Sequence, residues 1–208
     1  MKTALSVLSF VGLVAAAAPA SAVAVGGYTF NPNAFADTVI SSSGTFSTSG
    51  GTLSSVLTDT DAGTYAFSFS TGAFVEMGFT DNTLVNGAGA DLVLFDLGVP
   101  DSFKLSITIG GTMLSYASVA TGESAGGFPL NAVAIELGDF GIASGASLSS
   151  IVIGLDFIGG EGTVPSLSLV GALNSGDVGN VPEPATLLLT GLALGGLGVS
   201  SRRKQQAR

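Results

Sequence analysis

Residues 103–110 read FKLSITIG, a run in which apolar residues alternate with polar or small ones. Successive side chains of a β-strand point to opposite faces, so this period of two predicts a strand with one apolar side. Its apolar members are Phe103, Leu105, Ile107 and Ile109. Gly110 and Gly111 end the run, and a glycine pair between two alternating runs favours a two-residue hairpin turn.

The same period recurs through the middle of the chain. It predicts further strands within residues 65–70, 74–79, 91–96, 112–116, 133–137, 151–158 and 166–169. Segments rich in Gly, Asn, Asp and Pro separate them, as turns require. Several short strands at such spacing predict an all-β fold, a single antiparallel β-sandwich domain. The Ser/Gly/Thr-rich stretch 41–55 is expected to be an exposed loop or a weakly packed edge strand.

Charge excludes one class of partner. Once residues 1–22 and the tail from Pro182 are set aside, Lys104 is the only basic residue. Fourteen acids remain beside that one lysine, which gives a formal charge of −13. An acidic surface repels phosphate backbones, so we expect no nucleic-acid binding.

The chain contains no cysteine and no histidine. Disulfides, thiolate or imidazole zinc sites and a Ser-His-Asp triad are therefore excluded. Only chemistry that carboxylates can perform alone stays open.

The N-terminus has the three parts of a secretory signal peptide. Lys2 supplies the positive charge, residues 5–18 form a short apolar core, and Ala20-Ser21-Ala22 forms a small-residue cleavage site. We expect a signal helix over residues 1–22, export by the Sec machinery and cleavage after Ala22. A second site of the same type ends at Ala24.

The C-terminus has three parts as well. Val181-Pro182-Glu183-Pro184 is expected to be extended, because proline fixes φ and disfavours helix before it. Residues 185–200 carry no charge, which predicts a transmembrane helix somewhat shorter than the usual span of about 20 residues. The basic residues Arg202, Arg203 and Lys204 follow and favour a cytoplasmic end.

This tail resembles the PEP-CTERM sorting signal, which is also catalogued as the ice-binding protein C-terminal motif. The resemblance rests on Val181, Pro182, Glu183, Pro184, the apolar helix and the basic cluster Arg202, Arg203 and Lys204. It implies recognition by an exosortase that cuts near Pro-Glu-Pro. The protein would be tethered to the inner membrane by its C-terminus before processing, and would then reach the cell surface or the extracellular space.

Two stretches of the middle region resemble PEP-CTERM surface proteins with a jelly-roll-like ectodomain. The first runs from Gly78 to Asp96 and the second from Asp156 to Leu173. The resemblance implies a jelly-roll-like sandwich and brings no enzymatic activity. The expected organisation is a signal peptide (1–22), a β-sandwich ectodomain (23–173), a linker (174–180) and a sorting segment (181–208).

Four oxygen-bearing side chains cluster near one Gly-rich turn: Asp81, Asn82, Asn86 and Asp91. Calcium takes six to eight oxygen ligands from such groups, so these residues are a candidate calcium site. The alternative is turn chemistry, in which Asn-Gly and Asp stabilise loops without a metal.

A glycosidase needs only two carboxylates. The candidates in this chain are Glu76, Glu123, Glu136 and Asp156. We expect instead a non-enzymatic structural, adhesive or binding protein of the cell surface or extracellular matrix, with extracellular polysaccharide as a candidate partner. The alternative is a carboxylate-dependent enzyme acting on that polysaccharide. The absence of Trp and the presence of only three Tyr disfavour both such an enzyme and tight sugar binding.

Overall fold

A computed structural model describes residues 22–156 and 163–177. The signal helix and the C-terminal helix expected from the sequence lie outside these residues. No helix in the described part has both the length and the apolar character needed to cross a membrane.

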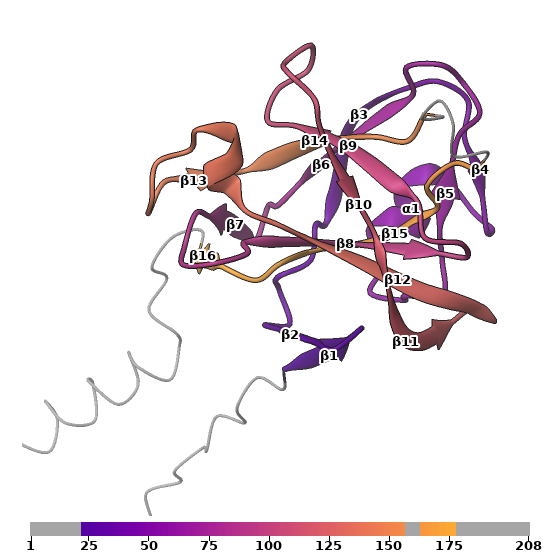
Figure 1. Cartoon of the computed structure of the whole chain (residues 1–208), viewed down its shortest axis with the longest axis horizontal. Helices are drawn as coiled ribbons and strands as arrows, with labels where there is room; N and C mark the ends of the chain where they lie inside the picture. Colours follow the sequence, from indigo (N-terminus) through magenta and orange to yellow (C-terminus); the bar gives the residue numbers. More distant parts are fainter. Residues whose placement is uncertain (1–21, 157–162, 178–208) are drawn as a thin grey trace, which may run out of the picture. The chain divides into compact units, whose positions relative to one another are not determined.

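The described chain is all-β with antiparallel sheets (Figure 1). One larger sheet has the strand order β10-β9-β14-β6-β3, and the other has the order β11-β12-β8-β15-β5-β4. The strands of the first are β10 (Leu114–Ala117), β9 (Ser102–Ser106), β14 (Ser150–Gly154), β6 (Phe74–Gly78) and β3 (Thr38–Ser43). Those of the second are β11 (Val119–Ala125), β12 (Phe128–Ile135), β8 (Leu92–Leu97), β15 (Leu167–Ala172), β5 (Ala66–Phe67) and β4 (Ser47–Thr48).

Short elements complete the domain. A hairpin pairs β1 (Val23–Val25) with β2 (Tyr28–Phe30), and a small sheet has the order β13-β7-β16. The strands of that sheet are β13 (Ser147–Leu148), β7 (Asn82–Val85) and β16 (Ser175–Asp177). The helices are α1 (Leu53–Leu57), which Thr52 caps, and the 3₁₀ helix η1 (Leu137–Phe140).

The two larger sheets share one hydrophobic core, which makes the fold sandwich-like. Strand β8 is buried along its whole length, and its Leu94 pairs with Val133 of β12 and Val170 of β15. The other sheet contributes alternate residues, among them Met77 of β6 and Leu105 of β9, each fully buried. The period of two therefore directs apolar side chains into the core, as the sequence predicts.

The hairpin β1–β2 packs its aromatic side chains on Phe95 of β8. The ring of Phe30 lies 5.9 Å from that of Phe95, and Tyr28 lies 6.2 Å from it. Gly171 of β15 admits the Phe30 ring, because a Cβ there would lie 2.6 Å from Phe30 Cε1. This packing buries the side of β8 on which Phe95 lies. Since the opposite side of β8 faces the core between the two larger sheets, the strand is apolar on both sides.

The alternating run at 103–110 is only partly a strand. β9 ends at Ser106, and Ile109 is 55% exposed. The Ser106 hydroxyl donates to the Thr108 carbonyl (2.8 Å) and accepts from the Thr108 N–H (3.3 Å), which turns the chain before the predicted turn. The hairpin to β10 does form, with Leu105 opposite Leu114, but a loop of residues 107–113 connects its strands.

The segment predicted as a linker (174–180) contains β16. Its Ser175 pairs with Leu84 of β7 and its Asp177 with Asn82, so the folded domain continues beyond Leu173. The Ser/Gly/Thr-rich stretch 41–55 holds the end of β3 and all of β4, and these strands form the outer edges of the two larger sheets.

Replacing Gly171 with alanine should destabilise the domain by about 1–3 kcal/mol, because the new Cβ overpacks against the Phe30 ring. Urea denaturation measures the change. Gly138→Ala is the matched control, since the nearest atom to its Cβ lies 3.5 Å away, an ordinary contact. Equal stabilities of the two variants would contradict the close packing of Phe30 on β15.

Candidate functional site

The residues of the two processing signals fall almost entirely outside the described chain. This applies to Ala20 and to Val181, Pro182, Glu183, Pro184, Arg202, Arg203 and Lys204. Ala22 is described; it is exposed and directly precedes β1, which begins at Val23.

Of the candidate calcium ligands, Asp91 has a clear structural role. Its side chain is fully buried, and Oδ1 accepts hydrogen bonds from Gly87 N–H (2.7 Å) and Asn174 Nδ2 (2.8 Å). Its Oδ2 accepts from Leu137 N–H at 2.9 Å. Three N–H donors satisfy this carboxylate, and the Gly87 bond favours the turn interpretation.

The other three candidates have different surroundings. The Asn86 amide donates to the Ile142 carbonyl at 2.6 Å. Asn82 is buried, and neither of its side-chain polar atoms has a hydrogen-bond partner among the described residues. Asp81 lies beside Asp37: partial desolvation and the Asp37 carboxylate raise the pKa of Asp81. In the described residues, no group of three or more Asp, Glu, His or Cys side chains is arranged to hold a metal ion.

The four candidate catalytic carboxylates make separate contacts. Glu76 of β6 accepts hydrogen bonds from the Ser41 hydroxyl (2.8 Å) and the Ser150 hydroxyl (3.2 Å). Glu123 of β11 accepts from Gly26 N–H at 3.1 Å. Both carboxylates thus bind neighbouring segments of the fold.

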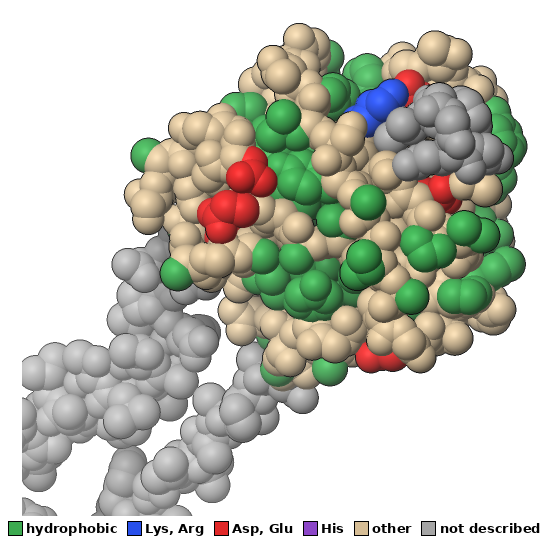
Figure 2. Space-filling view, in the orientation of Figure 1, with side chains coloured by type: hydrophobic (Ala, Val, Ile, Leu, Met, Phe, Trp, Pro, Cys, Tyr) green, Lys and Arg blue, Asp and Glu red, His purple; other side chains and the backbone are tan. Residues whose placement is uncertain are grey.

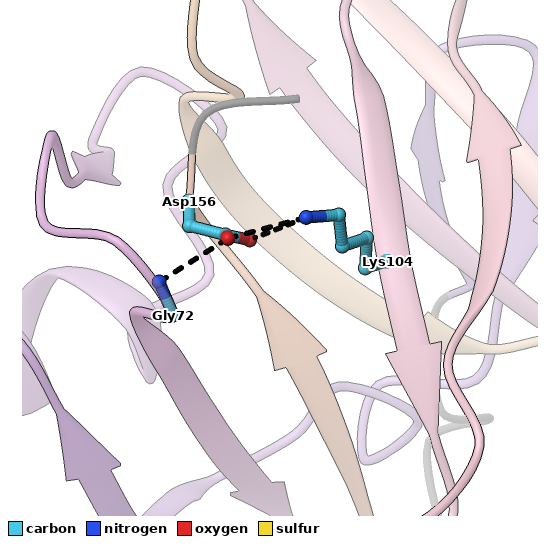
Figure 3. A network of polar contacts seen from close by, with 3 residues as sticks. All are labelled: Gly72, Lys104 and Asp156. Atoms are coloured by element: carbon cyan, nitrogen blue, oxygen red, sulfur yellow. Dashed lines mark hydrogen bonds and ion pairs between the residues drawn. The ribbon is translucent and has the colours of Figure 1, made fainter. Parts of the chain in front are cut away.

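Asp156 pairs with Lys104, the only basic residue among those described (Figure 3). Lys104 Nζ lies 3.1 Å from both carboxylate oxygens, and Gly72 N–H donates to Oδ2 at 3.2 Å. Figure 3 shows the three residues reaching one another from separate segments. The pair is partly exposed, so we regard it as a link between β9 and the end of β14 rather than a reactive site.

The fourth candidate, Glu136, caps η1. Its side chain accepts from Gly138 N–H, and its pKa is raised by partial desolvation and by the carboxylates of Asp91 and Asp139. Glu136 therefore lies near two other acids. The hydrogen bonds of the four candidate carboxylates go to separate partners within the described residues.

A second buried carboxylate, Asp96, was not among the sequence candidates. Its Oδ1 accepts from Ser166 N–H (2.9 Å), and its Oδ2 accepts from Asp101 N–H (3.1 Å) and the Ser118 hydroxyl (3.0 Å). Burial raises its pKa to about 6, against the effect of these hydrogen bonds. A signal was available: an acid at position 96 interrupts the apolar side of a strand at the fifth of its six residues.

A groove opens between the β9–β10 loop and η1. It encloses about 310 Å³ and is lined by Ser106, Ile107, Thr108, Gly111, Thr112, Leu114, Asp139 and Phe140. Tyr116 of β10 supports it: its hydroxyl donates to Asp139 Oδ2 at 2.9 Å, and its ring lies 6.1 Å from that of Phe140. Burial and the Asp139 carboxylate raise the pKa of Tyr116.

A second groove, of about 270 Å³, lies beside a row of aromatic rings. Phe69 is 75% exposed and contacts Phe67, which stacks on Tyr65, which in turn meets Phe128 edge-on. The groove is lined mainly by apolar side chains, among them Phe67, Phe69 and Val99.

Comparison with known proteins identifies the tail. Residues 180–204 match the family model of the PEP-CTERM protein-sorting motif, so the chain carries this motif and the prediction is confirmed. The motif implies a secreted protein whose C-terminal membrane-anchoring tail is processed by an exosortase and which ends on the cell surface. No curated protein and no solved structure matches the chain.

Asp96 should make stability depend on pH in an unusual direction. A carboxyl whose pKa is raised on folding binds its proton more tightly in the native state. The contribution of Asp96 to stability is therefore greatest below pH 3.8, the ordinary pKa of the group, and is lost as the pH rises through its folded pKa of about 6. The loss amounts to about 3 kcal/mol, at about 1.4 kcal/mol per unit.

Urea denaturation of wild type and Asp96→Asn between pH 4 and pH 8 tests this. Asparagine does not titrate, so wild type should lose stability relative to the variant as pH rises. A constant difference between the two curves would contradict a raised pKa at Asp96.

Proposed function

We propose that this chain, which carries a PEP-CTERM sorting motif, is the precursor of an exported surface protein. Its mature part is the β domain. This domain acts by binding or by building surface structure rather than by catalysis. The observation that carries the proposal is the sorting motif at residues 180–204, beside a domain whose paired strands end at Asp177. The motif therefore follows the last strand almost directly.

The start of the domain supports signal cleavage after Ala22. Strand β1 begins at Val23, and its three residues each pair with a residue of β2. Cleavage at the alternative site, after Ala24, would remove Val23 and Ala24 and leave one paired residue. Cleavage after Ala22 keeps all three pairs between β1 and β2.

The contacts of the candidate carboxylates support a non-enzymatic role. Glycoside hydrolysis places two carboxyl groups about 5–10 Å apart across the scissile bond. Among the described residues, Asp139 is the only acid that lines the groove between the β9–β10 loop and η1. The carbohydrate-active enzyme stays the second candidate, and it would need a second acid at this groove.

The jelly-roll-like fold is also part of the proposal. The chain passes repeatedly from one larger sheet to the other, as from β8 to β9, from β10 to β11 and from β14 to β15. Such crossings are typical of Greek-key and jelly-roll sandwiches. A sandwich of this kind in the extracellular matrix would offer its loops and sheet faces to polysaccharide or to other surface proteins.

Replacing Pro182, Glu183 and Pro184 together with alanine should block processing, because the substitutions remove the part of the motif near which the exosortase would cut. The uncut precursor should accumulate in the membrane fraction of the native cells, and its mass should include the basic tail. Surface labelling and mass spectrometry measure both effects.

The control replaces Gln205 and Gln206 with alanine, since these residues lie beyond the matched motif. This variant should be processed like wild type. Normal processing of the triple variant would overturn the assignment of the exosortase as processing partner.

A further inference from the structure

The groove between the β9–β10 loop and η1, called here the η1 groove, has the size of a small-ligand site. Its volume of about 310 Å³ lies at the lower end of the range for such sites, about 300–1,000 Å³. Figure 2 shows acidic side chains beside hydrophobic ones in the part of the surface nearest β13. The groove thus combines polar and apolar chemistry within a space that suits one or two small rings.

The polar side of the η1 groove has unused hydrogen-bonding capacity. Neither the Thr108 nor the Thr112 hydroxyl has a hydrogen-bond partner within the described chain, and both residues are exposed. Asp139 accepts from Tyr116 through Oδ2, which leaves Oδ1 without a donor from any described residue. The groove therefore offers two hydroxyls and one carboxylate oxygen to a ligand rich in hydroxyl groups.

The apolar side contains Phe140, with Ile107 and Leu114. An aromatic face carries partial negative charge and attracts polarised C–H bonds. A pyranose ring presents C–H bonds on its faces and hydroxyls at its edge, so both sides of the groove match it at once.

The fold holds these groups in place before any ligand arrives. Tyr116 fixes Asp139 by a hydrogen bond and lies against Phe140, while Glu136 caps the start of η1. Gly141 ends η1 with a φ of 74°, a conformation that favours glycine. Gly111 lets its loop close on the hydroxyls, since a Cβ there would lie 2.5 Å from Ser106 Oγ. Such preorganisation lowers the entropic cost of binding.

We propose that the η1 groove binds one ring of a neutral saccharide. The inference rests on the binding role proposed above and names its site and ligand class. Neutral sugars are favoured over uronic acids, because the one charged group in the groove is a carboxylate and the region 23–181 has a formal charge of −13. A single Phe platform and few hydrogen bonds imply weak binding of one ring, with a Kd on the order of 1 mM.

The test uses the full chain in a detergent without a sugar headgroup. Saturation-transfer NMR titrations compare the methyl β-glycosides of glucose, galactose and mannose with methyl β-D-glucuronide. At least one neutral glycoside should bind. The glucuronide should bind at least about tenfold more weakly, because its carboxylate would be desolvated in the groove and repelled by Asp139.

Two variants then locate the site. Asp139→Asn keeps an acceptor for Tyr116 but removes the charge, and should weaken binding about tenfold. Thr108→Val combined with Thr112→Val removes both hydroxyls at nearly constant shape, and should weaken binding by about three- to tenfold per hydroxyl. Thermal melts should stay unchanged. The two threonine hydroxyls bond to no other described residue, and the asparagine at position 139 keeps an acceptor for the Tyr116 hydroxyl.

Matched controls are Thr60→Val and Phe69→Ala, two exposed residues outside the η1 groove. Both should bind like wild type. Failure of all three neutral glycosides to bind, equal or tighter binding of the glucuronide, or a loss of binding only in Phe69→Ala would each overturn the assignment. None of these results would bear on exosortase processing, which the mass of the tail reports separately.

Discussion

The buried carboxylate of Asp91 is the interaction on which the rest of the domain depends. It follows the turn between β7 and β8 and accepts hydrogen bonds from Gly87, Leu137 and Asn174, which belong to three segments far apart in the sequence. Through Leu137 it fixes the start of η1, and therefore the position of Asp139 and Phe140 in the η1 groove. Through Asn174 it fixes the entry to β16, the last strand before the sorting motif. Removing a carboxylate of this kind would leave three N–H donors unsatisfied, at a cost of about 1–3 kcal/mol for each one that stays buried.

The sequence predicted interior strands because their apolar side chains fill one core, from one side of β6 and from both sides of β8. The runs at 74–79 and 91–96 correspond to β6 and β8, whereas the run at 133–137 covers only the end of β12 and continues into η1. The edge strand β11 and the accessory strand β16 were not predicted, since they read VATGESA and SGD, without an apolar side. The turn prediction was wrong for Gly110-Gly111, because Ser106 ends β9 before this pair. Two other glycine pairs form two-residue hairpin turns at positive φ: Gly26-Gly27, between Val25 and Tyr28, and Gly126-Gly127, between Ala125 and Phe128.

The candidate site was less predictable for a physical reason. Asp96 and Asp91 lie in or beside one alternating run, yet they are buried and bonded to segments 40 or more residues away, which no local pattern encodes. The η1 groove likewise joins a loop near residue 108 to a helix near residue 139. Glu136 and Asp91 were singled out for chemistry, and the structure gives them capping and turn roles. The C-terminal sorting motif, by contrast, was predictable because such a signal is recognised as linear sequence, and the match at residues 180–204 confirms it.

We propose that an acidic β domain remains after both ends of the chain are removed. Intact-mass measurement of the protein recovered from the surface of native cells tests it most directly. We expect a chain that begins at Val23 and lacks Arg202, Arg203 and Lys204. A surface protein that retains residues 1–22 or the basic tail would contradict the account.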